Sequence, residues 1–245
     1  MGERRVVAIS DAAGYVGPSL ARLLAPGHDL VLGDPPADLV AELEAGGAAV
    51  EVVEGTRDLS DPAATEALVS RAIDRFDRLD AAAAFTGRIV VGRFLRSTIE
   101  DLRETLVGCV EAPYQLLRAV VPVMIERGGG QILLFTSAAG ARPTPGAPLY
   151  SSARAAANML VRNVADEVVG RNVQINAIGT NFMDFPGFLA ANRALDAEGR
   201  ARVEAMVPMG RLGTMDELAH IALPFIDGTS RFTTGQFLGV AGGWI

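Results

Sequence analysis

Short apolar runs alternate with helical segments along almost the whole chain, and this alternation restricts the possible folds more than any other feature. The pattern predicts strands at 5–10, 29–33, 49–53, 79–84, 131–136 and 173–177, and helices at 16–24, 37–45, 62–76, 99–127 and 149–169. Strands that alternate with helices form right-handed β-α-β units, and helices then cover both faces of a parallel sheet. We therefore expect a single doubly wound, Rossmann-like α/β domain over residues 1–245, with a parallel seven-stranded sheet.

Two parts of the chain depart from this regular alternation. Pro113 and Pro122 predict kinks or breaks within the long helical stretch at 99–127, because proline cannot donate a backbone hydrogen bond. The segment 179–207 has no clear period, and we expect it to form a lid over a substrate pocket. It carries three aromatic residues, Phe182, Phe185 and Phe188.

Composition and charge exclude several classes of protein. No apolar run approaches the roughly 18 residues that cross a bilayer, and Met1–Arg5 lead straight into an apolar run without the features of a signal peptide. The single cysteine, Cys109, is compatible with a reducing cytoplasm. The net charge is −7 and no basic stripe is present, so we expect neither a membrane nor a nucleic acid as partner.

All 22 basic residues are arginine, and the chain contains no lysine. This excludes any mechanism that needs a lysine amine, such as a Schiff base, a phosphate-binding lysine or an active-site ammonium group. Arginine stays cationic at any working pH, but its planar fork does not replace a compact ammonium at every position.

The turn at 10–17 follows the first predicted strand, where a Rossmann fold places a dinucleotide. Such a turn needs glycines so that the backbone can approach a pyrophosphate. The sequence here resembles the Thr-Gly-x-x-x-Gly-x-Gly of short-chain dehydrogenases, but Asp11 and Tyr15 replace its first two glycines. A carboxylate repels a pyrophosphate and a tyrosine ring fills its space, so both changes oppose dinucleotide binding. Under this interpretation Asp34, at the end of the second strand, is a solvated carboxylate.

Three polar residues have the spacing of a catalytic group. Ser137 ends a predicted strand at the sheet edge where open α/β sheets carry their chemistry. Tyr150 opens the next helix and Arg154 lies four residues further on, so both share one helix face. Arginine at this position favours a tyrosine phenolate, which is a general base.

The pattern Ser-x12-Tyr-x3-Arg resembles the triad of halohydrin dehalogenases, a family related to the short-chain dehydrogenases. The loop that contains Tyr15 resembles that family's aromatic signature, and 180–183 resembles its halide-binding loop. Cys109 aligns approximately with the catalytic asparagine of related enzymes. The resemblance implies a halide or nucleophile site at Gly14, Tyr15, Thr180, Asn181, Phe182 and Met183. It implies a substrate pocket at Phe85, Ala138, Phe185 and Phe188.

This resemblance implies that the enzyme displaces halide from a vicinal haloalcohol to give an epoxide, and opens epoxides with small anions in reverse. Ser137 would bind the substrate hydroxyl and Tyr150, held near phenolate by Arg154, would remove its proton. The activity would be a lyase-type carbon–halogen cleavage that needs no cofactor and no metal. The family further implies a cytoplasmic homotetramer.

Two alternatives stay open. The chain is then either an NAD(P)-dependent short-chain dehydrogenase/reductase that tolerates arginine, or a non-catalytic scaffold subunit of the same fold. Binding of a nicotinamide cofactor distinguishes the first alternative. The second is opposed by the sequence, because a scaffold protein without catalytic activity is not expected to retain Ser137, Tyr150 and a cation together.

Overall fold

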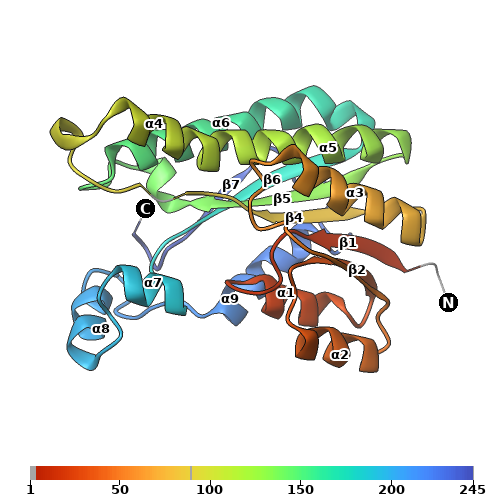
Figure 1. The fold of residues 1–245 in the computed structure, drawn as a ribbon, viewed down its shortest axis with the longest axis horizontal. Coiled ribbons are helices and arrows are strands. Elements are labelled where there is room, and N and C mark those ends of the chain that lie inside the picture. The colour runs from red at the N-terminus through yellow and green to blue at the C-terminus, as the bar shows by residue number, and fades with distance from the viewer. Residues whose placement is uncertain (1–3, 89, 245) are drawn as a thin grey trace.

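Seven parallel strands form one sheet in the order β3-β2-β1-β4-β5-β6-β7 (Figure 1). Their bounds are β1 Arg5–Ile9, β2 His28–Gly33, β3 Val50–Val53, β4 Ala81–Phe85, β5 Gly130–Ser137, β6 Val173–Thr180 and β7 Phe237–Val240. The computed structural model describes residues 4–88 and 90–244, so Met1–Glu3 of the expected N-terminal run lie outside the described residues. The strand order reverses between β1 and β4. Ligands of such sheets bind at this switch point, beyond the carboxyl ends of the strands.

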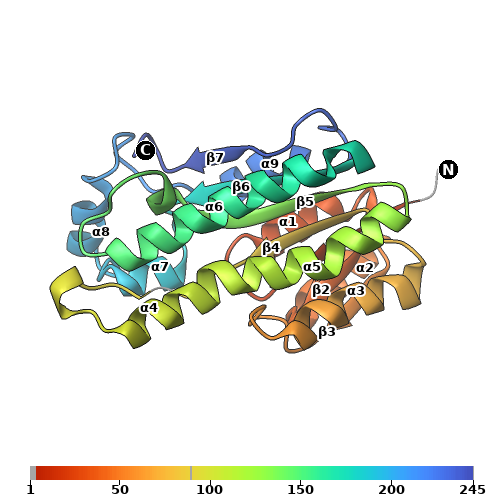
Figure 2. The same ribbon diagram turned by 90° about the horizontal axis from the view of Figure 1, so that it is seen from above.

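Helices cover both faces of the sheet (Figure 2). The α-helices are α1 Gly17–Leu24, α2 Ala37–Ala45, α3 Pro62–Phe76, α4 Ile99–Leu106, α5 Ala112–Glu126, α6 Pro148–Val168, α7 Pro186–Ala191, α8 Ala197–Glu204 and α9 Met215–Ala222. One core lies between the sheet and α3, α5 and α6, and the other lies between the sheet and α1, α2 and α9. Residues of β1 alternate between the two: Val6 and Ala8 enter the first core, Val7 and Ile9 the second. The expected doubly wound seven-stranded fold is confirmed.

The stretch at 99–127 forms two helices joined by a π-turn, Val107–Glu111. Pro113 has no N–H for the carbonyl of Cys109, and the N–H of Ala112 bonds to Val107 five residues back. Helix α5 continues through Pro122, so a break predicted there is absent. By length and hydropathy Ile99–Glu126 passes the test for a membrane-spanning helix, but buried side chains of α5 belong to the first core.

The segment 179–207 is more regular than the sequence predicts. It contains the short helices α7 and α8. The carboxylate of Asp196 accepts a hydrogen bond from the backbone N–H of Gly199 at 2.7 Å and caps α8, and Pro186 opens α7. Helices of one or two turns are too short to leave a readable apolar period, which explains the difference.

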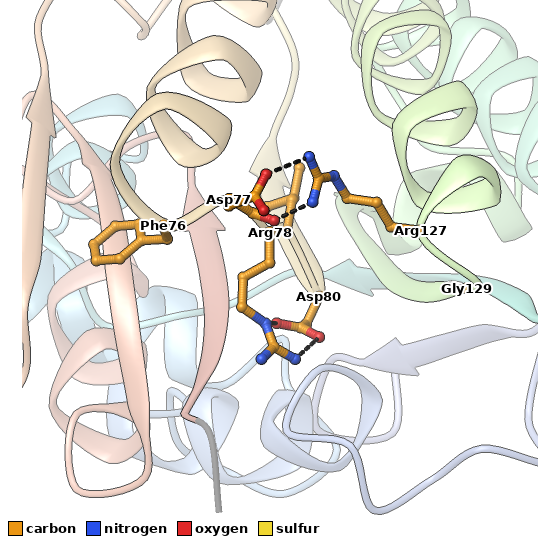
Figure 3. Close-up of a pocket in the computed structure, with 7 residues that line it drawn as sticks. Phe76, Asp77, Arg78, Asp80, Arg127 and Gly129 are labelled. Atoms are coloured by element: carbon orange, nitrogen blue, oxygen red, sulfur yellow. Dashed lines mark hydrogen bonds and ion pairs between the residues drawn. The ribbon is translucent and has the colours of Figure 1, made fainter.

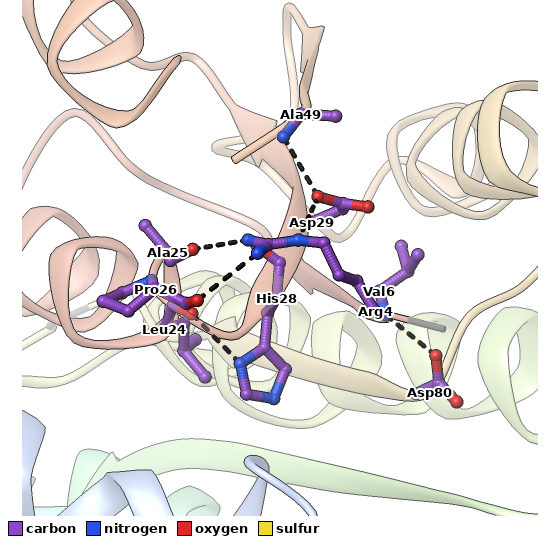
Figure 4. A network of polar contacts seen from close by, with 9 residues as sticks. All are labelled: Arg4, Val6, Leu24, Ala25, Pro26, His28, Asp29, Ala49 and Asp80. Atoms are coloured by element: carbon purple, nitrogen blue, oxygen red, sulfur yellow. Dashed lines mark hydrogen bonds and ion pairs between the residues drawn. The ribbon is translucent and has the colours of Figure 1, made fainter. Parts of the chain in front are cut away.

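A polar network fixes the amino ends of the strands (Figure 4). The guanidinium of Arg4 donates to the carboxylate of Asp29 at 2.8 Å, and that carboxylate also accepts from the N–H of Ala49 at 3.0 Å. On the other side of β1, the carboxylate of Asp80 accepts from the N–H of Val6 at 2.8 Å. These contacts tie β1, β2, β3 and β4 together at the edge away from the switch point.

A hollow of about 290 Å³ lies at this same amino edge (Figure 3). Ion pairs span it: Arg78 contacts Asp80 at 2.7 Å, and Arg127 contacts Asp77 at 2.8 Å. Both arginines are satisfied within the protein, and the hollow lies at the edge opposite the one where α/β sheets carry chemistry. We therefore assign it a structural role. Its lining is Phe76, Asp77, Arg78, Leu79, Asp80, Arg127 and Gly129.

Candidate functional site

Ser137 is the last residue of β5 and lies at the carboxyl edge of the sheet, as expected. Its Oγ accepts a hydrogen bond from the backbone N–H of Ala139 at 3.1 Å, which fixes the hydroxyl. The hydroxyl proton has only a long contact, 3.4 Å, to the carbonyl of Thr180. A bond of this length is weak, so Ser137 can direct its proton to a substrate oxygen instead.

Tyr150 and Arg154 lie one turn apart on α6, which begins at Pro148. The guanidinium carbon of Arg154 lies 5.1 Å from the centroid of the Tyr150 ring, within the range of a cation–π contact. Tyr150 packs in one apolar cluster with Ala139, which belongs to the turn after Ser137, and with Cys109. The fold therefore brings the three predicted catalytic residues to one place.

Arg154 is 4% exposed, and its guanidinium is held by an uncharged residue that the sequence did not indicate. Nη2 donates to the carbonyl of Thr86 at 2.5 Å and Nη1 donates to the hydroxyl of Thr86 at 3.2 Å. Nε is buried and has no hydrogen-bond partner, and no ion pair to Arg154 is found within 4–88 and 90–244. Thr86 could have been found from its position, because it directly follows β4 at the same carboxyl edge of the sheet.

Tyr15 reaches across this edge from the turn after β1 to the end of β6. Its hydroxyl shares a 2.5 Å hydrogen bond with the hydroxyl of Thr180. Its ring makes edge contacts with Phe85 at 5.8 Å and with Phe185 at 5.0 Å between centroids. Burial raises the pKa of Tyr15 above its ordinary value despite the hydrogen bond to Thr180, so this hydroxyl stays protonated.

Two backbone N–H groups of the loop after β6, the expected halide-binding loop, are occupied by bonds within the protein. The N–H of Phe182 donates to the side-chain oxygen of Asn181 at 2.9 Å, and the N–H of Asn181 donates to the carbonyl of Val240 at 3.3 Å. The Phe182 ring packs against Trp244 at 5.5 Å, and Met183 is 2% exposed in the second core. Of the expected halide residues, only Tyr15 and Thr180 meet through their side chains.

The residues expected to line a substrate pocket divide into two groups. Phe85 stacks on Phe135 at 4.7 Å, and Phe185 and Phe188 lie 6.3 Å apart, so these rings continue the aromatic surface around Tyr15. Ala138, in contrast, is fully buried and lines nothing exposed. Gly14 has open space where a Cβ would lie.

Features of a dinucleotide site survive along the same edge. A Cβ on Gly17 would lie 2.0 Å from the carbonyl oxygen of Asp11, so this close turn needs glycine. Val16 precedes α1 and offers no side-chain cap, but the N–H of Gly17 donates to the carbonyl of Gly14 at 3.2 Å and Pro18 has no N–H. The start of α1 therefore offers a ligand mainly the positive end of the helix dipole. The carboxylate of Asp34 is not merely solvated: it accepts from the N–H groups of Gly55 and Thr56 at 2.8 and 2.9 Å.

Comparisons with known proteins agree with this arrangement. A family profile described as enoyl-(acyl carrier protein) reductase matches residues 16–245. The 3-oxoacyl-[acyl-carrier-protein] reductase FabG of Thermotoga maritima is 25% identical over 246 residues, covering 99% of this chain and 98% of that protein. The 2,5-dichloro-2,5-cyclohexadiene-1,4-diol dehydrogenase LinX of Sphingobium indicum is 27% identical, covering 98% and 96%. The structure of levodione reductase has a TM-score of 0.85 at 25% identity, again covering 98% and 96%.

These similarities overturn the expected activity. The relatives are named as reductases and dehydrogenases, so the expectation of a halohydrin dehalogenase, with lyase-type cleavage and no cofactor, is wrong. The physical reason is that a serine, a tyrosine and a neighbouring cation can donate or remove a proton at a substrate oxygen in hydride transfer and in halide displacement alike. Arg154 and the altered turn therefore do not by themselves specify a halide.

Proposed function

Because the chain belongs to the short-chain dehydrogenase/reductase family, within the enoyl-(acyl carrier protein) reductase group, we propose that it is a nicotinamide-dependent oxidoreductase. It interconverts a hydroxyl and a carbonyl group on an organic substrate. The match of the reductase family profile over residues 16–245 supports this most directly. Tyr150 and Arg154, on one face of α6 beside the turn that follows Ser137, supply the polar groups that the reaction needs.

Each of the three residues has a role in this reaction. Ser137, oriented by the N–H of Ala139, donates a hydrogen bond to the substrate oxygen. Tyr150 gives a proton to that oxygen in reduction and takes it back in oxidation. Arg154 places a fixed positive charge beside Tyr150 and stabilises negative charge that develops on the tyrosine or substrate oxygen. With 4% of Arg154 exposed, water screens this charge weakly.

The residues along the carboxyl edge fit an NAD(P) cofactor in most of its length. Asp34 directly follows β2, where an acidic residue binds a ribose hydroxyl, and the positive end of the α1 dipole faces the position of a pyrophosphate in such folds. The nicotinamide, when bound, supplies or accepts the hydride. Tyr15 is the obstacle, since its ring must turn away from Thr180 to admit that part of the cofactor.

Names of the relatives suggest the substrate class. FabG is named for a 3-oxoacyl group, LinX for a cyclic diol, and levodione reductase for a dione. All present an oxygen-bearing carbon within a largely apolar frame. The aromatic surface of Phe85, Phe185 and Phe188 suits such a frame, so we propose a secondary alcohol or ketone on an apolar skeleton.

One experiment tests the proposed function. Purified protein is titrated with NADH and with NADPH by calorimetry, and is then assayed at 340 nm with a 3-oxoacyl thioester, a cyclic dione and an acyclic methyl ketone. We expect binding of one cofactor and turnover of at least one carbonyl compound. Absence of binding by either cofactor, together with no change at 340 nm on every substrate, would refute the proposal.

The assembly is a further part of the proposal. An apolar hollow of about 450 Å³ lies beside the edge strand β7 and includes Leu238 and Ile221. Both side chains are about 40% exposed, and a second copy of the chain could cover them. We propose a homotetramer in the cytoplasm. Light scattering coupled to size-exclusion chromatography tests the tetramer, and a monomer or dimer at micromolar concentration would contradict it.

A further inference from the structure

The buried guanidinium of Arg154 depends on a single neighbour. Both terminal nitrogens donate to Thr86, one to its carbonyl and one to its hydroxyl. The hydroxyl of Thr86 has a second contact, since it donates to the carbonyl of Phe135 at 3.4 Å. Phe135 lies two residues before Ser137 on β5. A bond of this length is weak, so the firm contacts of Thr86 are its two bonds to the cation beside Tyr150.

Gly87, the residue after Thr86, has no side chain and so leaves room for the guanidinium of Arg154. Gly87 has φ +134°, and a Cβ built on it would lie 1.7 Å from Nη2 of Arg154. A side chain at this position would displace the guanidinium, whatever the backbone strain. The shape of the loop after β4 thus defines where the guanidinium can lie.

The π-turn Val107–Glu111, between α4 and α5, contacts this loop at Arg88. A Cβ on Gly108 would lie 2.4 Å from both the N and the Cβ of Arg88, so Gly108 approaches that residue as closely as the chain permits. The thiol of Cys109 points to the carbonyl of Arg88 at 3.7 Å. Arg88 is two residues beyond Thr86. The π-turn therefore packs directly against Arg88 in the loop after β4.

We propose that Thr86 is a positioning residue for the reaction, which holds Arg154 against Tyr150 and is itself held in register by the π-turn through Gly108 and Arg88. This inference rests on the proposed oxidoreductase function for its kinetic consequences. The contact between Thr86 and Arg154 can also be tested without any activity.

The test is a double-mutant cycle between Thr86→Val and Arg154→Met. Valine keeps the shape of threonine but removes the acceptor for Nη1, so Arg154 is less well held. We expect Thr86→Val to lower kcat about 10- to 100-fold with KM nearly unchanged, as for a small displacement of a catalytic group. Thr86→Ser, which restores the hydroxyl, should recover most of kcat. In the Arg154→Met background, Thr86→Val should lower kcat no further.

A second pair of variants tests the π-turn. Gly108→Ala should force Arg88 to move and lower kcat by a similar factor, even if Thr86→Val folds poorly. Gly92→Ala is the matched control, because Gly92 lies in the loop after β4 that also contains Arg88, and a Cβ there meets nothing within 4 Å. It should retain the kcat of the wild type. Equal kcat values for Gly108→Ala and Gly92→Ala would overturn the role of the turn.

Two further results would overturn the role of Thr86. One is a wild-type kcat in Thr86→Val. The other is a double variant whose loss of kcat equals the product of the losses in Thr86→Val and Arg154→Met. If the wild-type protein turns over no carbonyl compound, the proposed function fails and thermal unfolding of the same four proteins decides this inference. Non-additive shifts of the melting temperature then support the Thr86–Arg154 contact, and additive shifts refute it.

Discussion

The guanidinium carbon of Arg154 lies 5.1 Å from the centroid of the Tyr150 ring, and the two residues are 4% and 9% exposed. A positive charge in this position acts on the tyrosine through little water, so its field is weakly screened. The planar guanidinium is held in this position by its two-point contact with Thr86.

Replacing the tyrosine separates its chemistry from its packing. Tyr150→Phe keeps the ring against Ala139 and Cys109 but removes the hydroxyl that exchanges a proton. We expect kcat/KM to fall by at least about 10²-fold, and the melting temperature to stay close to that of the wild type. Tyr114→Phe, at a half-exposed tyrosine on α5, is the control and should keep full activity. Substantial turnover by Tyr150→Phe would contradict the assignment.

Removing the ring of Tyr15 should favour the cofactor. Tyr15→Ala eliminates the hydrogen bond to Thr180 and the ring contacts with Phe85 and Phe185, which the nicotinamide end must otherwise break. We expect calorimetry to show NAD(P)H bound about tenfold more tightly, equivalent to about 1.4 kcal/mol. Tyr15→Phe keeps the ring and should change the affinity much less. Weaker binding by Tyr15→Ala would show that the ring supports the cofactor instead of obstructing it.

Substitution by alanine should lower the stability at one glycine of the turn at 10–17 and leave it unchanged at another. Gly17→Ala places a methyl group 2.0 Å from the carbonyl oxygen of Asp11, whereas Gly14→Ala meets nothing within 4 Å. Relief of the clash requires the turn to shift, at a cost of about 1–3 kcal/mol in the free energy of unfolding. Urea denaturation should therefore show Gly17→Ala clearly destabilised and Gly14→Ala close to the wild type. Equal stabilities would mean that the turn is not tightly packed.

The network around Asp80 should make part of the stability sensitive to acid. Burial alone would raise the pKa of this carboxyl, but hydrogen bonds from Arg78 and from the N–H of Val6 outweigh burial and hold the pKa below its ordinary value of 3.8. Because the folded-state pKa is lowered, the contribution is present above about pH 4 and is lost as the pH falls through the folded-state pKa.

Asp80→Asn tests this contribution. At pH 7 the variant should lose about 1–3 kcal/mol of unfolding free energy, because a charged acceptor of buried donors is replaced by a weaker one. Between pH 5 and 2 its stability should fall less steeply than that of the wild type. Asp74→Asn, at an exposed position on α3, is the control. Parallel pH profiles for Asp80→Asn and the wild type would contradict this account.

Local patterns in the sequence predicted most of the architecture. The α/β alternation predicted the doubly wound sheet and located six of its seven strands, because burial on both faces leaves continuous apolar runs in the strands. The position of β7 was not located. The helices α7 and α8 were not predicted, because each is too short to leave a readable apolar period in the sequence. Pro122 was expected to disturb its helix, yet packing of α5 in the first core keeps that helix continuous.

The sequence by itself determined the fold and the meeting of Ser137, Tyr150 and Arg154, because strand ends and i, i+4 positions on a helix are local properties. It did not determine the chemistry, since the same three residue types can manage a proton in hydride transfer or in halide displacement. Only the tertiary structure decided what holds the arginine. Thr86 binds Arg154 across 68 positions of the chain, Gly87 leaves room for the same guanidinium, and Gly108 packs against Arg88 from another element. No local pattern in the sequence records such contacts.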